Sequence, residues 1–246
     1  MPTWTWPYLM NAPSVFYADS LAPTKALWSA WRVPGAVGSG RPAGPRNWQW
    51  SATTVLAIAS LEAGLEELLL AAHARRISVE GQTILRKERG YLVESALQAP
   101  NAGKIERAVF TAFGTRMNSL SPLPPEAHFT ARRKDLAHAG SGRGAATPSP
   151  TTWVELAKWL DAVVFIRHAI AHGDVARHTS FPSAGEGMLW VKMQNGRWSV
   201  QQPHALTSLR VVVAVYNAAA SVLASALGTP GTLPLTPPDD VFDYGS

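Results

Sequence analysis

An arginine and two histidines close a long apolar run at FIRHAIAHGD, residues 165–174. The preceding segment, 153–166, is rich in Trp, Val, Leu and Phe, so the polar ending is abrupt. Arginine offers a planar fork of donors that fits phosphate, and histidine accepts or donates a proton near neutral pH. Arg167, His168 and His172 therefore form a candidate site for an anion whose reaction needs proton transfer.

A helix over residues 153–172 would bring these three side chains together. One stripe of residues at three-and-four spacing is predicted to face other helices: Leu156, Leu160, Val163, Arg167 and Ile170. This pattern puts Arg167 at a core-facing position. At about 100° per residue, His168 and His172 lie about 100° and about 140° from Arg167, on one side of the last turn. There the helix dipole favours positive charge.

Cleavage of RNA by its own 2′-hydroxyl is one reaction that such groups can catalyse. The reaction requires removal of the hydroxyl proton, delivery of a proton to the leaving oxygen, and stabilisation of charge on the phosphoryl oxygens. Histidine can serve either proton transfer and arginine can bind the phosphoryl group. Neither a metal nor a cofactor is required.

The segment RHAIAHG resembles the R-x4-H signature of HEPN domains ("higher eukaryotes and prokaryotes nucleotide-binding"), in particular of their ribonuclease branch. The resemblance implies a bundle of four to five helices that dimerises, so that two motifs form one composite cleft. It also implies a metal-independent endoribonuclease, as in toxin–antitoxin or anti-phage systems. On this resemblance Arg167 binds phosphate, His172 is the catalytic histidine, and His168 occupies a position where the family usually has Asn.

Glu62 is the sole charge on a second predicted stripe, made of Ser51, Val55, Ile58, Glu62, Leu65 and Leu69. A carboxylate on a buried stripe needs a partner. Since an acidic residue from an early helix often lies near the motif in the resembled family, Glu62 is predicted to orient Arg167 or His172. The alternative is a glutamate at the edge of the stripe that reaches solvent.

Two other interpretations stay open at this stage. His168 and His172 stand four apart, and Asp174 and His178 follow, a set that could hold zinc. The chain could also be a catalytically silent helical module that binds a partner protein or a nucleotide, with WTWPY (residues 4–8) as a contact. A second copy of the R-x4-H spacing, Arg133 to His138, precedes a Gly/Ser-rich loop and is interpreted as a decoy or a basic patch.

Composition limits the alternatives further. The 246 residues contain no cysteine, which excludes disulfides, thiolate zinc sites and a cysteine nucleophile. The segment 73–143 has 12 Lys and Arg against 6 Asp and Glu, while the rest of the chain has 10 against 11. This basic excess suits RNA or an acidic partner such as an antitoxin protein, although it also fits an ordinary solvated surface. The first residues lack the pattern of a secretory signal, so a cytoplasmic location is expected.

The elements that must position the site are mainly helices. We expect an all-α, up-and-down bundle divided into an N-terminal arm and loop (1–48), a HEPN-like helical domain (49–228) and a Pro-rich, disordered tail (229–246). Within the domain, apolar periodicity predicts helices over 50–76, 82–98, 104–120, 153–172 and 203–228. Asn195-Gly196 predicts a β-hairpin before the last helix. That helix is interrupted by Asn217 and is short for a membrane span, so we expect it to be central or at a dimer interface.

Overall fold

The computed structural model describes residues 6–30, 47–80, 100–132, 146–147, 149–172, 185–192 and 198–242. Its α-helices are α1 (Trp6–Val15), α2 (Ala22–Ala30), α3 (Asn47–Glu80), α5 (Ala102–Phe113), α6 (Trp153–Ala171), α7 (Gln202–Ala226) and α8 (Pro238–Val241). A π-helical turn, Phe16–Ser20, joins α1 to α2, and short 3₁₀ turns occupy Met117–Ser119 and Pro125–Ala127. The predicted all-α class is confirmed. The predicted helix over 82–98 lies outside the described residues.

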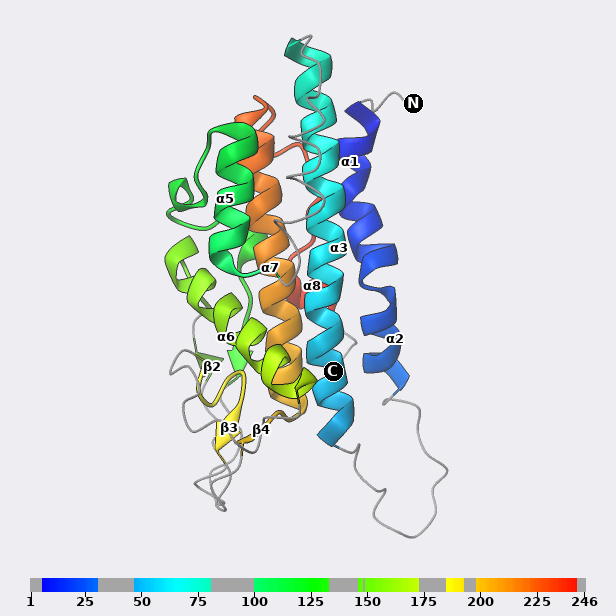
Figure 1. Cartoon of the computed structure of the whole chain (residues 1–246), viewed down its shortest axis with the longest axis vertical. Helices are drawn as coiled ribbons and strands as arrows, with labels where there is room; N and C mark the ends of the chain where they lie inside the picture. Colours follow the sequence, from blue (N-terminus) through cyan, green and yellow to red (C-terminus); the bar gives the residue numbers. More distant parts are fainter. Residues whose placement is uncertain are drawn as a thin grey trace.

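Helix α7 is the centre of the bundle (Figure 1). Helix α3 lies along it in the same direction, α1 and α2 cover the far side of α3, and α5 and α6 pack on the other side. By length and composition α7 could cross a membrane, yet 78% of its most apolar window is buried inside the bundle. Helix α7 is therefore the central helix of the core, as its apolar surface predicts.

In the described residues, two small antiparallel strand pairs accompany the helices. Strands β3 (Val191–Lys192) and β4 (Trp198–Ser199) pair just before α7, which confirms the predicted hairpin insertion. Its predicted turn, Asn195-Gly196, lies outside the described residues. The pairing of β1 (Ala131–Arg132) with β2 (Ala146–Thr147) was not predicted, because each strand has only two residues and no turn signal of a short hairpin joins them.

The N-terminal segment belongs to the same core as the rest of the bundle. Phe16 is fully buried and its ring stacks on that of Tyr216 of α7, with centroids 3.8 Å apart and planes 12° from parallel. A Cβ on Gly64 of α3 would lie 2.2 Å from this ring, so glycine is needed there for α3 to approach. Residues 6–30 are thus a helical layer of the bundle and not a separate arm, since Leu9 and Trp28 are buried as well.

The expectation of a disordered tail is wrong for residues 229–242. Leu233 and Phe242 are only 8% and 3% exposed, and α8 packs against α7. Proline-rich composition indicated disorder, but the apolar residues between the prolines reach the core. Burial of this apolar surface offsets the entropy of ordering the segment.

Buried polar contacts attach this tail to the bundle. The side-chain amide of Asn217 donates to the carbonyls of Glu126 (2.6 Å) and Thr236 (2.9 Å), and its oxygen accepts from the Tyr17 hydroxyl (2.6 Å). The backbone N–H of Thr236 donates to the same hydroxyl at 3.0 Å. All of the polar groups of the Asn217 side chain are therefore satisfied within the core.

An ion pair attaches the tail a second time. Arg210 Nε lies 2.7 Å from Asp239 Oδ1, and Arg210 Nη1 donates to the carbonyl of Thr130 at 2.8 Å. The other carboxylate oxygen of Asp239 accepts from the N–H of Thr130 at 3.0 Å. We call these five residues, Tyr17, Arg210, Asn217, Thr236 and Asp239, the tail lock.

Candidate active site

Helix α6 carries the motif and starts at the predicted capping box. Thr152 Oγ1 accepts from the N–H of Glu155 at 3.3 Å, and the Glu155 carboxylate accepts from the N–H of Thr152 at 3.3 Å. The same carboxylate accepts from the N–H and the hydroxyl of Thr151, at 2.8 and 3.1 Å. These hydrogen bonds lower the pKa of Glu155 below its ordinary value of 4.5. The beginning of α6 is thereby well defined.

The other end of α6 presents the arginine and both histidines to solvent. His168 and His172 are exposed, and their ring centroids are 4.3 Å apart with planes tilted by 51°. His172 is the C-terminal cap, and its N–H donates to the carbonyl of His168 at 3.1 Å. Arg167 is half-buried beside them. The structure therefore brings together the two imidazoles, and the guanidinium is on the adjoining residue of the same turn.

Arg167 lies at the edge of the buried face and not on it, in contrast to the predicted stripe. The core-facing side of this turn is made by Ile166 and Ala169, each 1% exposed, whereas Ile170 is half-buried like Arg167. Successive residues of a helix point about 100° apart. The apolar spacing fits a buried stripe through Ile166 as well as one through Arg167, so the sequence alone does not distinguish the two. Because it lies at the edge, the guanidinium is accessible.

Arg167 makes no ion pair with any residue that the structure describes. Arginine side chains that are partly removed from water normally have an anionic or carbonyl partner, because the unpaired charge is costly to desolvate. The absence of such a partner in the described part of the chain leaves this guanidinium able to bind an external anion.

Glu62 is half-buried on α3, the helix that packs against α6. The fully buried side of α3 in this region is made by Ile58, Leu61 and Leu65. Glu62 therefore flanks the core. Its role in orienting Arg167 or His172 stays a prediction.

The zinc interpretation involves four residues, of which the structure describes His168 and His172. The described residues contain no group of three or more His, Asp or Glu side chains that could hold a metal ion. Asp174 and His178, which would complete the proposed set, lie outside the described residues, as does the second R-x4-H copy from Arg133 to His138.

The motif lies at the end of the bundle where α3 and α7 begin (Figure 1). The N-terminal ends of these two long helices carry the positive ends of their dipoles, which favours anions nearby. Trp48, the second residue of α3, is 57% exposed and gives this end an uncovered aromatic surface. Charge and apolar exposure thus occur at the same end of the molecule.

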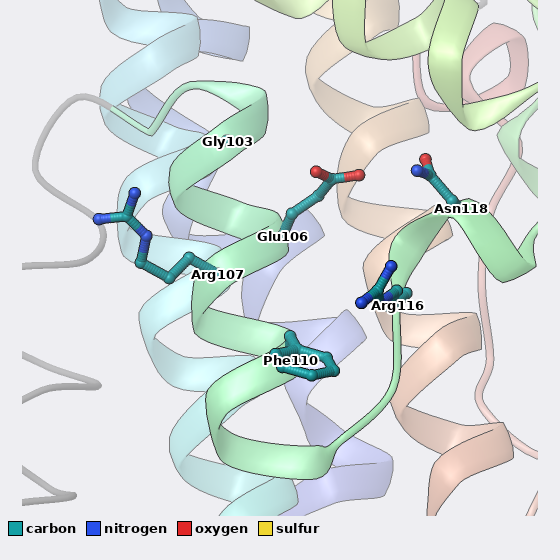
Figure 2. Close-up of a pocket in the computed structure, with 6 residues that line it drawn as sticks. All are labelled: Gly103, Glu106, Arg107, Phe110, Arg116 and Asn118. Atoms are coloured by element: carbon teal, nitrogen blue, oxygen red, sulfur yellow. The ribbon is translucent and has the colours of Figure 1, made fainter.

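A second cluster was missed by sequence reasoning. It lies on α5 and the turn that follows, where a pocket of about 270 Å³ is lined by Gly103, Glu106, Arg107, Phe110, Arg116 and Asn118 (Figure 2). No motif joins these positions in the sequence. The available signal was weak: Phe110 lies three and four positions after Arg107 and Glu106, on the polar side of a strongly amphipathic helix.

Comparisons with known proteins add no relative to this picture. No protein-family model matches the chain, and no match was found among curated proteins or solved structures.

Proposed function

We propose that the protein is a metal-independent endoribonuclease of the HEPN type, in which Arg167 and His172 carry the reaction. One observation supports this above the others. Two exposed imidazoles, 4.3 Å apart, lie beside an accessible guanidinium without an ion-pair partner in the described chain. This set supplies proton transfer and phosphate binding at one helix end.

The proposed reaction needs only these groups. His172 removes the proton of the 2′-hydroxyl, the 2′-oxygen attacks the adjacent phosphorus, and the bond from phosphorus to the 5′-oxygen breaks. A protonated histidine delivers a proton to that leaving oxygen, and the products are a 2′,3′-cyclic phosphate and a 5′-hydroxyl. Arg167 binds the non-bridging oxygens and stabilises their charge in the transition state.

A second copy of the chain would complete the site. A half-buried, unpaired arginine beside exposed apolar surface is unfavourable in an isolated chain. A two-fold axis near the motif would cover the apolar surface, including Trp48, and would place both Arg167 side chains and both pairs of histidines around one cleft. The helix end would then contribute to a composite site.

The decisive experiment is RNA cleavage by the purified protein in excess EDTA, with identification of the product ends. We expect cleavage and a 2′,3′-cyclic phosphate, and we expect Arg167→Ala and His172→Ala to abolish it. His138→Ala, which alters the other copy of the same spacing, is the matched control and should cleave normally. Activity that disappears with chelation and returns with zinc would favour the metal interpretation instead.

Expression of the protein in cells separates the enzyme from a silent binding module. An active ribonuclease of the toxin or anti-phage type should arrest growth, and either Arg167→Ala or His172→Ala should restore it. Growth arrest that is equally strong in the wild type and both variants would indicate that binding, and not cleavage, causes the effect.

The dimer is tested by measuring sedimentation and cleavage on one dilution series. Specific activity should fall in step with dissociation, because each chain supplies half of the site. A monomer that cleaves RNA at full specific activity would contradict the composite site.

A further inference from the structure

The pocket on α5 is a built cluster of polar and aromatic groups, distinct from the end of α6. Figure 2 shows Glu106, Phe110, Arg116 and Asn118 on the same side of α5, whereas Arg107 extends to the other side. Trp153, whose indole contacts Glu106, is the first residue of α6, and Arg167 is 14 residues further along. At 1.5 Å per residue the pocket is thus about 20 Å from the motif along this helix.

The chain after α5 turns back to close the pocket. Gly114 caps the helix with φ 67°, a left-handed conformation that favours glycine, and its N–H donates to the carbonyl of Phe110 at 2.8 Å. Met117, which is fully buried, anchors the following turn in the core. The reversal brings the Arg116 guanidinium to 5.2 Å from the centre of the Phe110 ring. The guanidinium and the ring are therefore held together before any ligand arrives.

The groups that face the pocket remain available for a ligand. Phe110 is 47% exposed, and Arg116 and Asn118 are exposed. Glu106 Oε1 accepts from the indole N–H of Trp153 at 2.8 Å, which fixes the carboxylate in the lining of the pocket. Within the described residues, Arg116 and Glu106 are not ion-paired. The donors of Arg116, the second oxygen of Glu106 and the part of the Phe110 ring that Arg116 leaves uncovered remain available.

We propose that this pocket binds one unpaired guanine base of an RNA strand. Unpaired bases are recognised by stacking on aromatic rings or guanidinium planes and by hydrogen bonds to their edges. Guanine has imino and amino donors on one edge, which suit the Glu106 carboxylate. Its O6 and N7 acceptors suit the donors of Arg116 and Asn118. A volume of about 270 Å³ lies just below the range of about 300–1,000 Å³ for drug-sized ligands, so the pocket admits a base and not a whole oligonucleotide.

The inference rests on the proposed function for its source of ligand, because RNA would be the substrate. Guanine in the pocket would then select which strand, or which position of it, reaches the end of α6. Binding of the base itself needs no cleavage, so the two proposals fail in different experiments.

The test uses 5′-GMP and the NMR signal of the Trp153 indole N–H, which is hydrogen-bonded to Glu106. The signal is assigned with Trp153→Phe. We expect GMP to shift it with saturation, and AMP, CMP and UMP to bind at least about fivefold more weakly. Equal binding of all four nucleotides, or a response to an acidic peptide but to no nucleotide, would overturn the proposal.

Four variants locate the binding. Phe110→Leu removes the stacking ring and should weaken GMP binding by about fivefold or more, as should Arg116→Gln. Gly103→Leu should block the pocket, because Gly103 lines it and a leucine side chain would fill part of its volume. The fold should tolerate the change, since a Cβ at position 103 would meet only the Asn101 amide oxygen, at an ordinary 3.7 Å. Lys158→Gln is the control, since it removes the same charge from an exposed side chain of α6 that does not line the pocket. Equal losses from Lys158→Gln and Arg116→Gln would contradict a specific base site.

The last comparison separates this site from the catalytic one. His172→Ala should bind GMP as the wild type does, whether or not the wild type cleaves RNA. If GMP does not bind and the protein cleaves RNA with no dependence on guanine, the base site is refuted and the proposed function stands. If GMP binds but RNA is never cleaved, the proposed function fails alone.

Discussion

Two arginines on neighbouring core helices have opposite surroundings. Arg210 of α7 belongs to the tail lock, where its guanidinium lies 2.7 Å from the Asp239 carboxylate and donates to the carbonyl of Thr130. Arg167 of α6 is similarly at the edge of the core, but no ion-pair partner for it occurs in the described ranges of the chain. Both side chains are positively charged, but within the described residues only Arg210 is paired with a carboxylate.

The difference indicates what each region does. In the tail lock the polar groups satisfy one another, so their removal should mainly change stability. At the end of α6 the polar groups face outward, and their removal should mainly change what the protein binds or transforms. The following predictions test this contrast, beginning with the largest expected effect.

Replacement of Arg167 or His172 by Ala should reduce RNA cleavage by at least about 10²-fold, the usual contribution of a positioned acid or base. The melting temperature should change little, because His172 is exposed and Arg167 lies at the edge of the core without an ion pair to any described residue. Arg210→Ala is the matched arginine control and should show the reverse: a lower melting temperature with cleavage retained. If the two arginine variants behave alike in both assays, the contrast between the regions is wrong.

Asn217→Leu should destabilise the fold by about 2–4 kcal/mol, measured by denaturant unfolding. The change removes the Asn217 partner of the half-buried Tyr17 hydroxyl and of two backbone carbonyls, although the hydroxyl keeps its hydrogen bond from the Thr236 N–H. A buried polar group that loses its partner costs about 1–3 kcal/mol. Ser221→Ala, another polar position in α7 but outside the tail lock, should change the free energy of unfolding by less than about 1 kcal/mol. A neutral Asn217→Leu would show that the lock is dispensable.

Tyr17 should make the fold sensitive to alkaline pH. Burial raises the pKa of Tyr17 to about 12, against the lowering effect of its hydrogen bonds with Thr236 and Asn217. Since the unfolded chain releases this proton near pH 10, the stabilisation is complete below pH 10 and is lost as the pH rises towards 12. Tyr17→Phe should therefore be less stable than the wild type at pH 8, and the difference should narrow between pH 10 and 12. A constant difference would exclude Tyr17 as the titrating group.

Glu155→Gln should give the smallest effect, a slightly lower melting temperature at pH 7. Hydrogen bonds from Thr151 and Thr152 lower the pKa of Glu155, so its carboxylate stabilises the folded state above the unfolded pKa and loses this effect as the pH falls below 4.5. The difference between variant and wild type should accordingly shrink in acid. RNA cleavage should be unchanged, because the capping box is at the opposite end of α6 from His172.

Local patterns predicted those parts of the fold that depend on neighbouring residues. The capping box at Thr152, the central position of α7 and the hairpin before it follow from short-range spacing and apolar periodicity, and all three are present. The exposed end of α6 was predicted to carry Arg167, His168 and His172, and the structure brings the two histidines into contact.

Long-range pairing is what the patterns could not show. In the sequence, Asn217 only interrupts an apolar helix. Its hydrogen bonds are not predictable there, because its partners Tyr17 and Thr236 are 200 and 19 residues away. The tail was predicted to be disordered for the same reason, because the residues that bind it are distant in the sequence. The pocket on α5 depends on a chain reversal at Gly114 that brings Arg116 back over Phe110, and no spacing rule anticipates that contact.

The bond from the Tyr17 hydroxyl to the Thr236 segment joins residues 219 positions apart. A ribosome makes position 17 long before positions 217 and 236, so the first helices emerge before the residues that satisfy the Tyr17 hydroxyl exist. Until Thr236 has been made, the Asn217 side chain lacks one of its hydrogen-bond partners in the middle of an apolar helix. The newly made chain therefore passes through a stage in which the core is incomplete. At that stage chaperones or a binding partner would have access to apolar surface that is buried in the finished molecule.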